Sequence, residues 1–146
     1  MTETGKTANE LAPGEEFEPA AFHVTQEFNE NYLHAVEDFH PRYMQGAAGG
    51  PPIVHPALLI NYSNITRSPS FRLPPGMAAV HTHEEVEYLA PAGVGGKLTV
   101  TWKVIGVYEK RGKPYQVVDA LIAGENGAPV LRRKTTNAFV AIPGGA

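Results

Sequence analysis

The sequence predicts an α+β domain in which helices come first and a long antiparallel sheet follows. Two helical patterns occupy the first half, at residues 25–37 and from Pro56 onward. The second half changes period: segments rich in Val, Ile, Thr, Tyr and Trp alternate with turn residues, which indicates strands joined by hairpin-type connections. Such a sheet must cover its apolar face, and the apolar segment from Pro56 is the obvious cover.

The first helix is expected over residues 25–37. Thr25 is a suitable N-cap, and Pro41 should end the helix near Asp38, because proline disfavours helical dihedrals in the residue before it. Apolar side chains at helical spacing then share one face: Phe28, Tyr32, Ala35 and Val36.

The second helix is expected to be long and deeply buried. The Gly- and Pro-rich segment 46–52 can only be a loop, and Pro56 suits a first helical position. An apolar pattern then continues through Ala57, Leu58, Ile60, Asn61, Tyr62 and Ile65. Residues 67–76, with three prolines and a glycine, should form an irregular connection.

The strands are predicted at 78–89, 97–108, 114–123 and 129–141. In the second of these, Leu98, Val100, Trp102 and Val104 alternate with polar residues, which gives one strongly apolar face. A sheet wrapped around one buried helix is the hot-dog arrangement, although periodicity alone does not separate it from other α+β folds.

Length and composition favour one globular domain over residues 17–146, preceded by a flexible, polar arm at 1–16. With 15 acidic and 12 basic residues, the net charge of −3 gives no attraction to nucleic acid or to an anionic membrane. The absence of cysteine excludes a disulfide framework and a thiolate nucleophile. Without a signal-peptide pattern or a membrane-spanning run, we expect a cytoplasmic protein.

Three stretches of the chain resemble one enzyme family. Tyr32 precedes Asp38 by six residues, and Pro41 follows Asp38 by three. A Gly-rich loop then leads into the second helix, and Pro91 to Leu98 follows an aromatic-rich strand. In this order and spacing, residues 20–140 resemble the MaoC-like (R)-specific enoyl-thioester hydratases. The likeness is greatest to the N-terminal-type hot-dog units of MaoC dehydratases.

This resemblance implies a hydratase or dehydratase of enoyl or 3-hydroxyacyl thioesters, carried on CoA or on acyl carrier protein, with no cofactor. It also implies a dimer, either with a second copy or with another hot-dog subunit. Two residues depart from the family motif: Tyr43 replaces its His, and His40 replaces its Asn. Because a tyrosine is no base near neutral pH, a non-catalytic acyl-binding subunit is the alternative. A hot-dog thioesterase is a third hypothesis.

The resemblance makes Asp38 the candidate for water activation, although a cap of the following turn is the simpler reading of that residue. His40 could shuttle a proton, Tyr43 could donate a hydrogen bond, and His55 could hold the loop or bind the thioester carbonyl. The simpler interpretations are a surface loop His for His40, packing of the ring for Tyr43, and a helix-entry imidazole bonded to the backbone for His55. Free backbone amides at the helix start would polarise that carbonyl. The residues expected to bind substrate are Gly49, Gly50, Pro56, Ala57, Arg132 and Arg133.

A competing pattern suggests a metal. In a regular strand His81 and His83 would share a face, as would Glu85 and Glu87, and these are ligand types of iron or zinc sites. The run is similar to the first cupin motif, which needs a further His in a later strand. Because no His follows His83, we expect no metal, and the four residues are interpreted as polar positions on one strand face.

Overall fold

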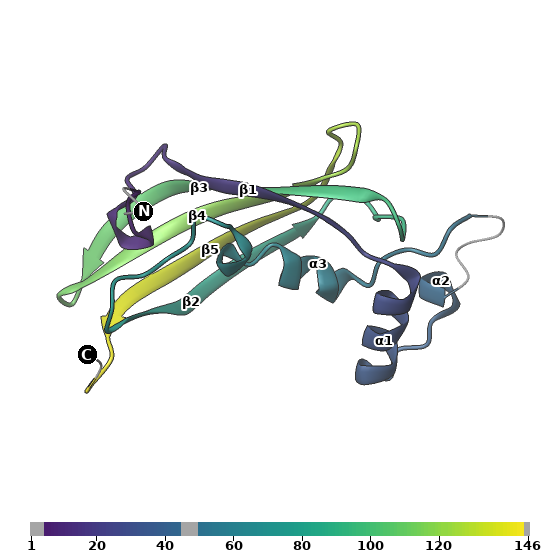
Figure 1. Cartoon of the computed structure of the whole chain (residues 1–146), viewed down its shortest axis with the longest axis horizontal. Coiled ribbons are helices and arrows are strands. Elements are labelled where there is room, and N and C mark those ends of the chain that lie inside the picture. Colours follow the sequence, from purple (N-terminus) through teal and green to yellow (C-terminus); the bar gives the residue numbers. More distant parts are fainter. Residues whose placement is uncertain (1–4, 45–49, 145–146) are drawn as a thin grey trace.

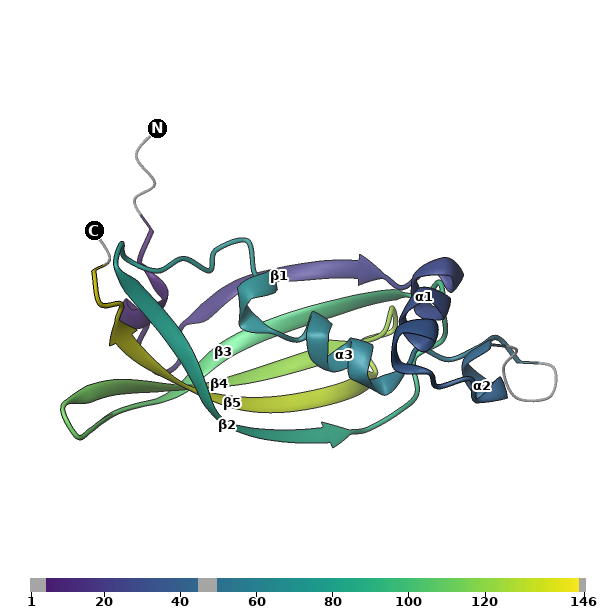
Figure 2. The ribbon, with the colours of Figure 1, turned by 90° about the horizontal axis from the view of Figure 1, so that it is seen from below.

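The structure is a computed structural model of the chain and describes residues 5–44 and 50–144. Its centre is an antiparallel sheet in the order β1-β3-β4-β5-β2. The strands are β1 (Glu16–His23), β2 (Met77–Tyr88), β3 (Lys97–Lys110), β4 (Lys113–Ala123) and β5 (Pro129–Ala141). Figures 1 and 2 show the sheet curving around a short helix, α3 (Pro56–Tyr62), which confirms the predicted hot-dog arrangement.

The four strands predicted in the second half are confirmed with small shifts at their ends. The first strand, β1, was not predicted. Its sequence contains Pro19, and its pairing with β3 slips between Phe17 and Ala20, so it lacks a regular alternating pattern. A proline is tolerated here because β1 is an edge strand, where one row of backbone amides has no ladder partner.

The first helix, α1 (Gln26–Val36), has the predicted N-cap: the Thr25 hydroxyl accepts a hydrogen bond from the Phe28 amide at 3.1 Å. It ends at Glu37, which takes a left-handed conformation with φ 55°. The predicted apolar face is wrong in part. The buried positions are Asn29 and Leu33, whereas Phe28 and Val36 are nearly half exposed.

The buried face of α1 is narrow because this helix lies beyond one end of the sheet, beside the short α2 (Pro41–Met44), as both ribbon views show. It therefore packs against loops and not against a broad sheet. Phe28 instead approaches the ring of Tyr62, at 6.1 Å between centroids.

The central helix is shorter than predicted, since Ile65 already belongs to a separate 3₁₀ turn at Ile65–Arg67. Two side chains donate hydrogen bonds to backbone carbonyls at the end of this helix. Ser63 Oγ donates to the Ile60 carbonyl at 2.8 Å, and the indole Nε1 of Trp102 donates to the Ser63 carbonyl at 2.8 Å. The sheet thus satisfies carbonyls that a helix end leaves without partners, and it fixes where α3 lies.

The core fills the space between α3 and the concave face of the sheet. Leu58 and Leu59 of α3 are buried there. The predicted alternation of β3 is confirmed, because each of its four apolar positions is buried: Leu98, Val100, Trp102 and Val104. None of the helices in the described part of the chain is long and apolar enough to cross a membrane.

Part of the expected flexible arm is packed against this domain. Ala8 is buried in a 3₁₀ turn (Ala8–Glu10), and its carbonyl accepts a hydrogen bond from the buried side chain of Gln116 at 2.8 Å. The polar composition of residues 5–16 concealed this contact, because a single alanine and backbone groups make it. Residues 1–4 lie outside the described part.

Candidate functional site

Asp38 and His55 are brought together although they lie 17 positions apart in the sequence. His55 Nε2 lies 3.0 Å from Asp38 Oδ2. The imidazole is mostly buried, whereas the carboxylate keeps 41% of its surface exposed. The other oxygen, Oδ1, accepts the His40 amide at 3.3 Å. Asp38 therefore does cap the turn after α1, and it also presents a carboxylate to solvent beside an imidazole.

The hydrogen bonds define the tautomer of His55. Its Nδ1 lies 3.1 Å from the backbone nitrogen of Ala57, which can only donate. Nδ1 must therefore carry a lone pair, and in the neutral ring the proton sits on Nε2, directed at Asp38. Both ring nitrogens are engaged, so His55 orients the carboxylate and is not itself free to accept a proton in this arrangement.

The start of α3 differs from the expectation of free amides. Pro56 has no N–H, the Ala57 amide donates to the His55 ring, and the Leu58 amide donates to the His55 carbonyl at 3.0 Å. His55 is thus the N-cap of its own helix. The structure therefore agrees with the simpler interpretation of His55, a helix-entry imidazole that bonds the backbone. A carbonyl-polarising group must come from elsewhere.

Aromatic rings surround His55. The centroids of Tyr43 and Tyr32 lie 4.9 Å and 5.1 Å from that of the imidazole. Tyr43 also contacts the ring of His40, whose Nδ1 accepts the Arg42 amide and so caps α2. Neither phenol oxygen of Tyr32 or Tyr43 has a hydrogen-bond partner among the described residues. Each is available to donate to a ligand.

Tyr88 completes the group from the end of β2. Its hydroxyl lies 3.4 Å from the Pro56 carbonyl. Burial raises the pKa of the Tyr88 phenol, and the nearby carboxylate of Glu84 raises that pKa further. The phenol therefore remains a neutral donor throughout the physiological range. Sequence reasoning missed Tyr88, since nothing in a strand pattern indicates which loop its last residue faces.

We expect Tyr88 to ionise only above the ordinary tyrosine pKa of about 10. Because the folded state favours the neutral phenol, this contribution to stability is complete below the unfolded pKa and is lost as pH rises through the folded one. Ultraviolet titration of the protein and of Tyr88→Phe measures it. The variant should lack a phenol that ionises late; loss of an early-titrating phenol would contradict the prediction.

Asn29 was also missed, and it is completely buried beneath this group. Its side-chain amide bonds the Tyr43 and Ile53 carbonyls, each at 3.1 Å, and accepts the His55 amide at 3.0 Å. The available signal was its place four residues before Leu33, on the same helix face. An amide does not fit an apolar pattern, so helical periodicity alone does not identify Asn29 as buried.

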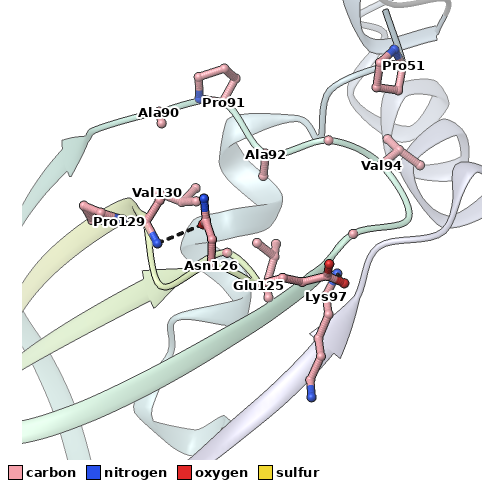
Figure 3. Close-up of a pocket in the computed structure, with 15 residues that line it drawn as sticks. Pro51, Ala90, Pro91, Ala92, Val94, Lys97, Glu125, Asn126, Pro129 and Val130 are labelled. Carbon is pink, nitrogen blue, oxygen red and sulfur yellow. Dashed lines mark hydrogen bonds between the residues drawn. The ribbon is translucent and has the colours of Figure 1, made fainter.

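Two cavities lie along the loop after β2. One of about 260 Å³ opens beside the start of α3, between Pro56, Leu59 and Tyr88. The other, of about 560 Å³, lies between residues 90–98 and the β4–β5 connection. Figure 3 shows its apolar lining, with Pro91, Ala92 and Val130 around it. Neither cavity is lined by Asp38 or His55, but the smaller one is lined by Pro56, which directly follows His55, and by Tyr88, so it lies nearer to the Asp38–His55 pair.

The remaining expected substrate residues lie apart from the Asp38–His55 pair. Arg132 is on the outer face of the sheet, 3.8 Å from Asp119. Arg133 is buried on the inner face, where it donates to the Ile60 carbonyl at 2.8 Å and pairs with Glu84. Arg133 therefore holds α3 in place, whereas the prediction was a cation that binds substrate at the surface. Gly50 precedes Pro51 at the rim of the larger cavity, and Gly49 lies outside the described residues.

The metal alternative assumed a regular strand, which is wrong. His81 pairs with Asn137 but His83 pairs with Thr136, so a bulge falls between them. Since neighbouring residues of β5 face opposite sides of the sheet, the two imidazoles do too. His81 lies 3.5 Å from Glu84. Over the described ranges, no cluster of three or more His, Asp or Glu side chains could hold a metal ion.

The antiparallel sheet curved around α3 places the protein in the class of hot-dog folds. The chain belongs to the family described as the FAS1-like, dehydratase domain region, whose profile matches residues 12–133. This result and the similar structures below confirm the resemblance to MaoC-like proteins. No curated protein matches the sequence.

Solved structures show the same fold at low sequence identity. The MaoC-like dehydratase from Rhodospirillum rubrum has a TM-score of 0.74 and 17% identity, with 94% of this chain and 98% of that one covered. The (R)-hydratase from A. caviae involved in PHA biosynthesis has a TM-score of 0.67 and 19% identity, with 93% of this chain and 100% of that one covered. The 3R-hydroxyacyl-ACP dehydratase complex HadBC from Mycobacterium tuberculosis has a TM-score of 0.68 and 21% identity, with 86% of this chain and 96% of that one covered.

Proposed function

We propose that this chain is a hydratase or dehydratase of enoyl and 3-hydroxyacyl thioesters, carried on CoA or on acyl carrier protein. The observation that supports this most is the Asp38–His55 pair, which holds a solvent-accessible carboxylate at the start of the central helix. It supplies a base at the position where the family motif has its Asp, even though Tyr43 stands where that motif has His.

The proposed hydration uses Asp38 as the base. Its carboxylate takes a proton from a water molecule as the oxygen bonds to Cβ of the enoyl group, and the same carboxyl returns a proton to Cα. His55 keeps the carboxylate oriented through its Nε2 proton. The Tyr43 hydroxyl polarises the thioester carbonyl, since the amides at the start of α3 are already used. Dehydration is the reverse sequence.

A second hot-dog subunit is part of this proposal. The cavity of about 260 Å³ beside Pro56 is slightly smaller than the roughly 300–1,000 Å³ of most ligand sites, so one chain encloses only part of an acyl thioester. The long strand β2 lies at the edge of the sheet and ends at Tyr88, next to this cavity. Its unpaired backbone groups are available to a partner strand, from another copy or another subunit.

One observation favours the alternative of a non-catalytic acyl-binding subunit. Both nitrogens of His55 are occupied, and a tyrosine such as Tyr43 is no base at neutral pH. Among the described residues, the exposed His40 is therefore the one candidate beside Asp38 for a second proton-transfer group. In that case a partner with an intact Asp–His pair would perform the reaction, and this chain would hold the acyl group.

The test is an assay of the purified chain with crotonyl-CoA and with a longer enoyl-CoA, following both loss of the enoyl absorbance and release of free thiol. Formation of 3-hydroxyacyl-CoA by the chain alone supports the proposed hydratase. Thiol release without hydration would identify a thioesterase. No reaction alone, with acyl-CoA binding retained and hydration restored by an added hot-dog subunit, would overturn the catalytic role in favour of the binding subunit.

A further inference from the structure

The amide of Asn29 lies at the point where three separate parts of the site meet. It is 0% exposed, although α1 as a whole is a surface helix at the end of the sheet. Burying an amide is unfavourable unless its polar groups are bonded, so a buried Asn calls for an explanation of what it bonds. All its partners are backbone groups next to the candidate site.

The orientation of this amide follows from its partners. Two of them, the Tyr43 and Ile53 carbonyls, can only accept, and the third, the His55 amide, can only donate. The NH₂ group must therefore face the carbonyls and Oδ1 must face His55. No other residue type of this size offers two donors and one acceptor in this geometry.

These bonds connect groups that the proposed reaction needs. The ring centroids of Tyr43 and His55 lie 4.9 Å apart, and Nε2 of His55 is hydrogen-bonded to Asp38. The two chain segments that Asn29 joins are also bonded to each other, because the Ile53 amide donates to the Arg42 carbonyl at 3.1 Å. Asn29 thus fixes the backbone on both sides of the Asp38–His55 pair without touching either side chain of that pair.

We propose that Asn29 is a positioning residue, which sets the His55 ring and Tyr43 relative to Asp38. Its catalytic consequence rests on the proposed function, but its structural consequence does not. When Asn29 is replaced, His55 loses the bond that holds its backbone, and its ring no longer has to accept from Ala57 and donate to Asp38 at the same time.

The experiment compares the full chain with Asn29→Asp, which keeps size and one acceptor but removes both donors, and with the smaller Asn29→Ser. Asn31→Asp is the matched control, because Asn31 is exposed on the same helix. Nitrogen-15 spectra of the His55 ring report its tautomer without any need for activity. We expect a single Nε2–H tautomer in the parent and in the control, and a mixed population in both Asn29 variants.

In the hydration assay, a displacement of this kind should lower kcat about tenfold to a hundredfold with little change in KM. If the parent chain proves inactive, the proposed function fails while the His55 spectra still decide the role of Asn29. Folded Asn29 variants with an unchanged His55 tautomer would overturn the inference. Should neither variant fold, amide exchange in the parent decides it: the His55 amide must be protected, and rapid exchange would refute the bond to Asn29.

Discussion

Replacing Asp38 by Asn is expected to lower the hydration rate of the chain by about 10²–10⁴-fold, the usual contribution of a positioned acid or base. The variant removes the base and keeps the shape. The carbonyl oxygen of Asn can still accept from His55 Nε2, which needs an acceptor because the Ala57 amide holds the proton off Nδ1. The NH₂ group of Asn then faces the His40 amide, so that hydrogen bond is lost. The loss should be small, because the existing bond of 3.3 Å is long and exposed.

Steady-state kinetics with crotonyl-CoA measure this effect, with Glu37→Gln as the control. Glu37 is an exposed carboxylate directly before Asp38, so its variant makes the same change in net charge beside the site. We expect the control to keep nearly full activity. A fully active Asp38→Asn protein would show that another group takes the proton from water.

Replacing Arg133 by Met should cause a large loss of stability. The Arg133 side chain is 5% exposed, pairs with Glu84 and donates to the Ile60 carbonyl at the end of α3. Its loss leaves the Glu84 carboxylate with only the longer contact to His81, and it removes one of the two side-chain donors to the Ile60 carbonyl. Breaking a buried pair in this way costs about 3–5 kcal/mol, and the lower end is expected because Glu84 keeps 30% of its surface in water.

Urea unfolding measures this difference, and the neighbouring Arg132→Met is its control. Arg132 is 56% exposed and lies 3.8 Å from Asp119, so its loss should change stability by no more than about 1 kcal/mol. The double variant Glu84→Gln/Arg133→Met should be more stable than Arg133→Met alone, because it removes the carboxylate that has lost its arginine. Equal losses for Arg132→Met and Arg133→Met would show that the buried pair has no special weight.

Local patterns were enough to predict most of the fold. The strands of the second half, the Thr25 cap and Pro56 as the first residue of a helix all follow from residues near one another in sequence. The errors arose where distant residues decide the outcome. The central helix stops early because Trp102 and Arg133, far along the chain, bind its last carbonyls.

In the candidate site, too, local patterns were predictive and contacts between distant residues were not. The family motif led to Asp38 and to the residues around it, and its Gly-rich segment led to His55, but spacing alone did not reveal that the two side chains meet. Asn29 and Tyr88 were missed because their roles depend on backbone groups of other loops. The adjacent arginines 132 and 133 were given one role, although strand alternation places them on opposite faces.

The only tryptophan of the chain makes the contact between sheet and helix directly observable. Trp102 is 1% exposed, and its indole nitrogen is bonded to the carbonyl just after α3. Its intrinsic fluorescence should therefore shift to longer wavelength whenever that helix detaches from the sheet, even if the strands stay paired. Emission wavelength and far-ultraviolet circular dichroism, followed together during unfolding, would then distinguish release of the helix from loss of the sheet.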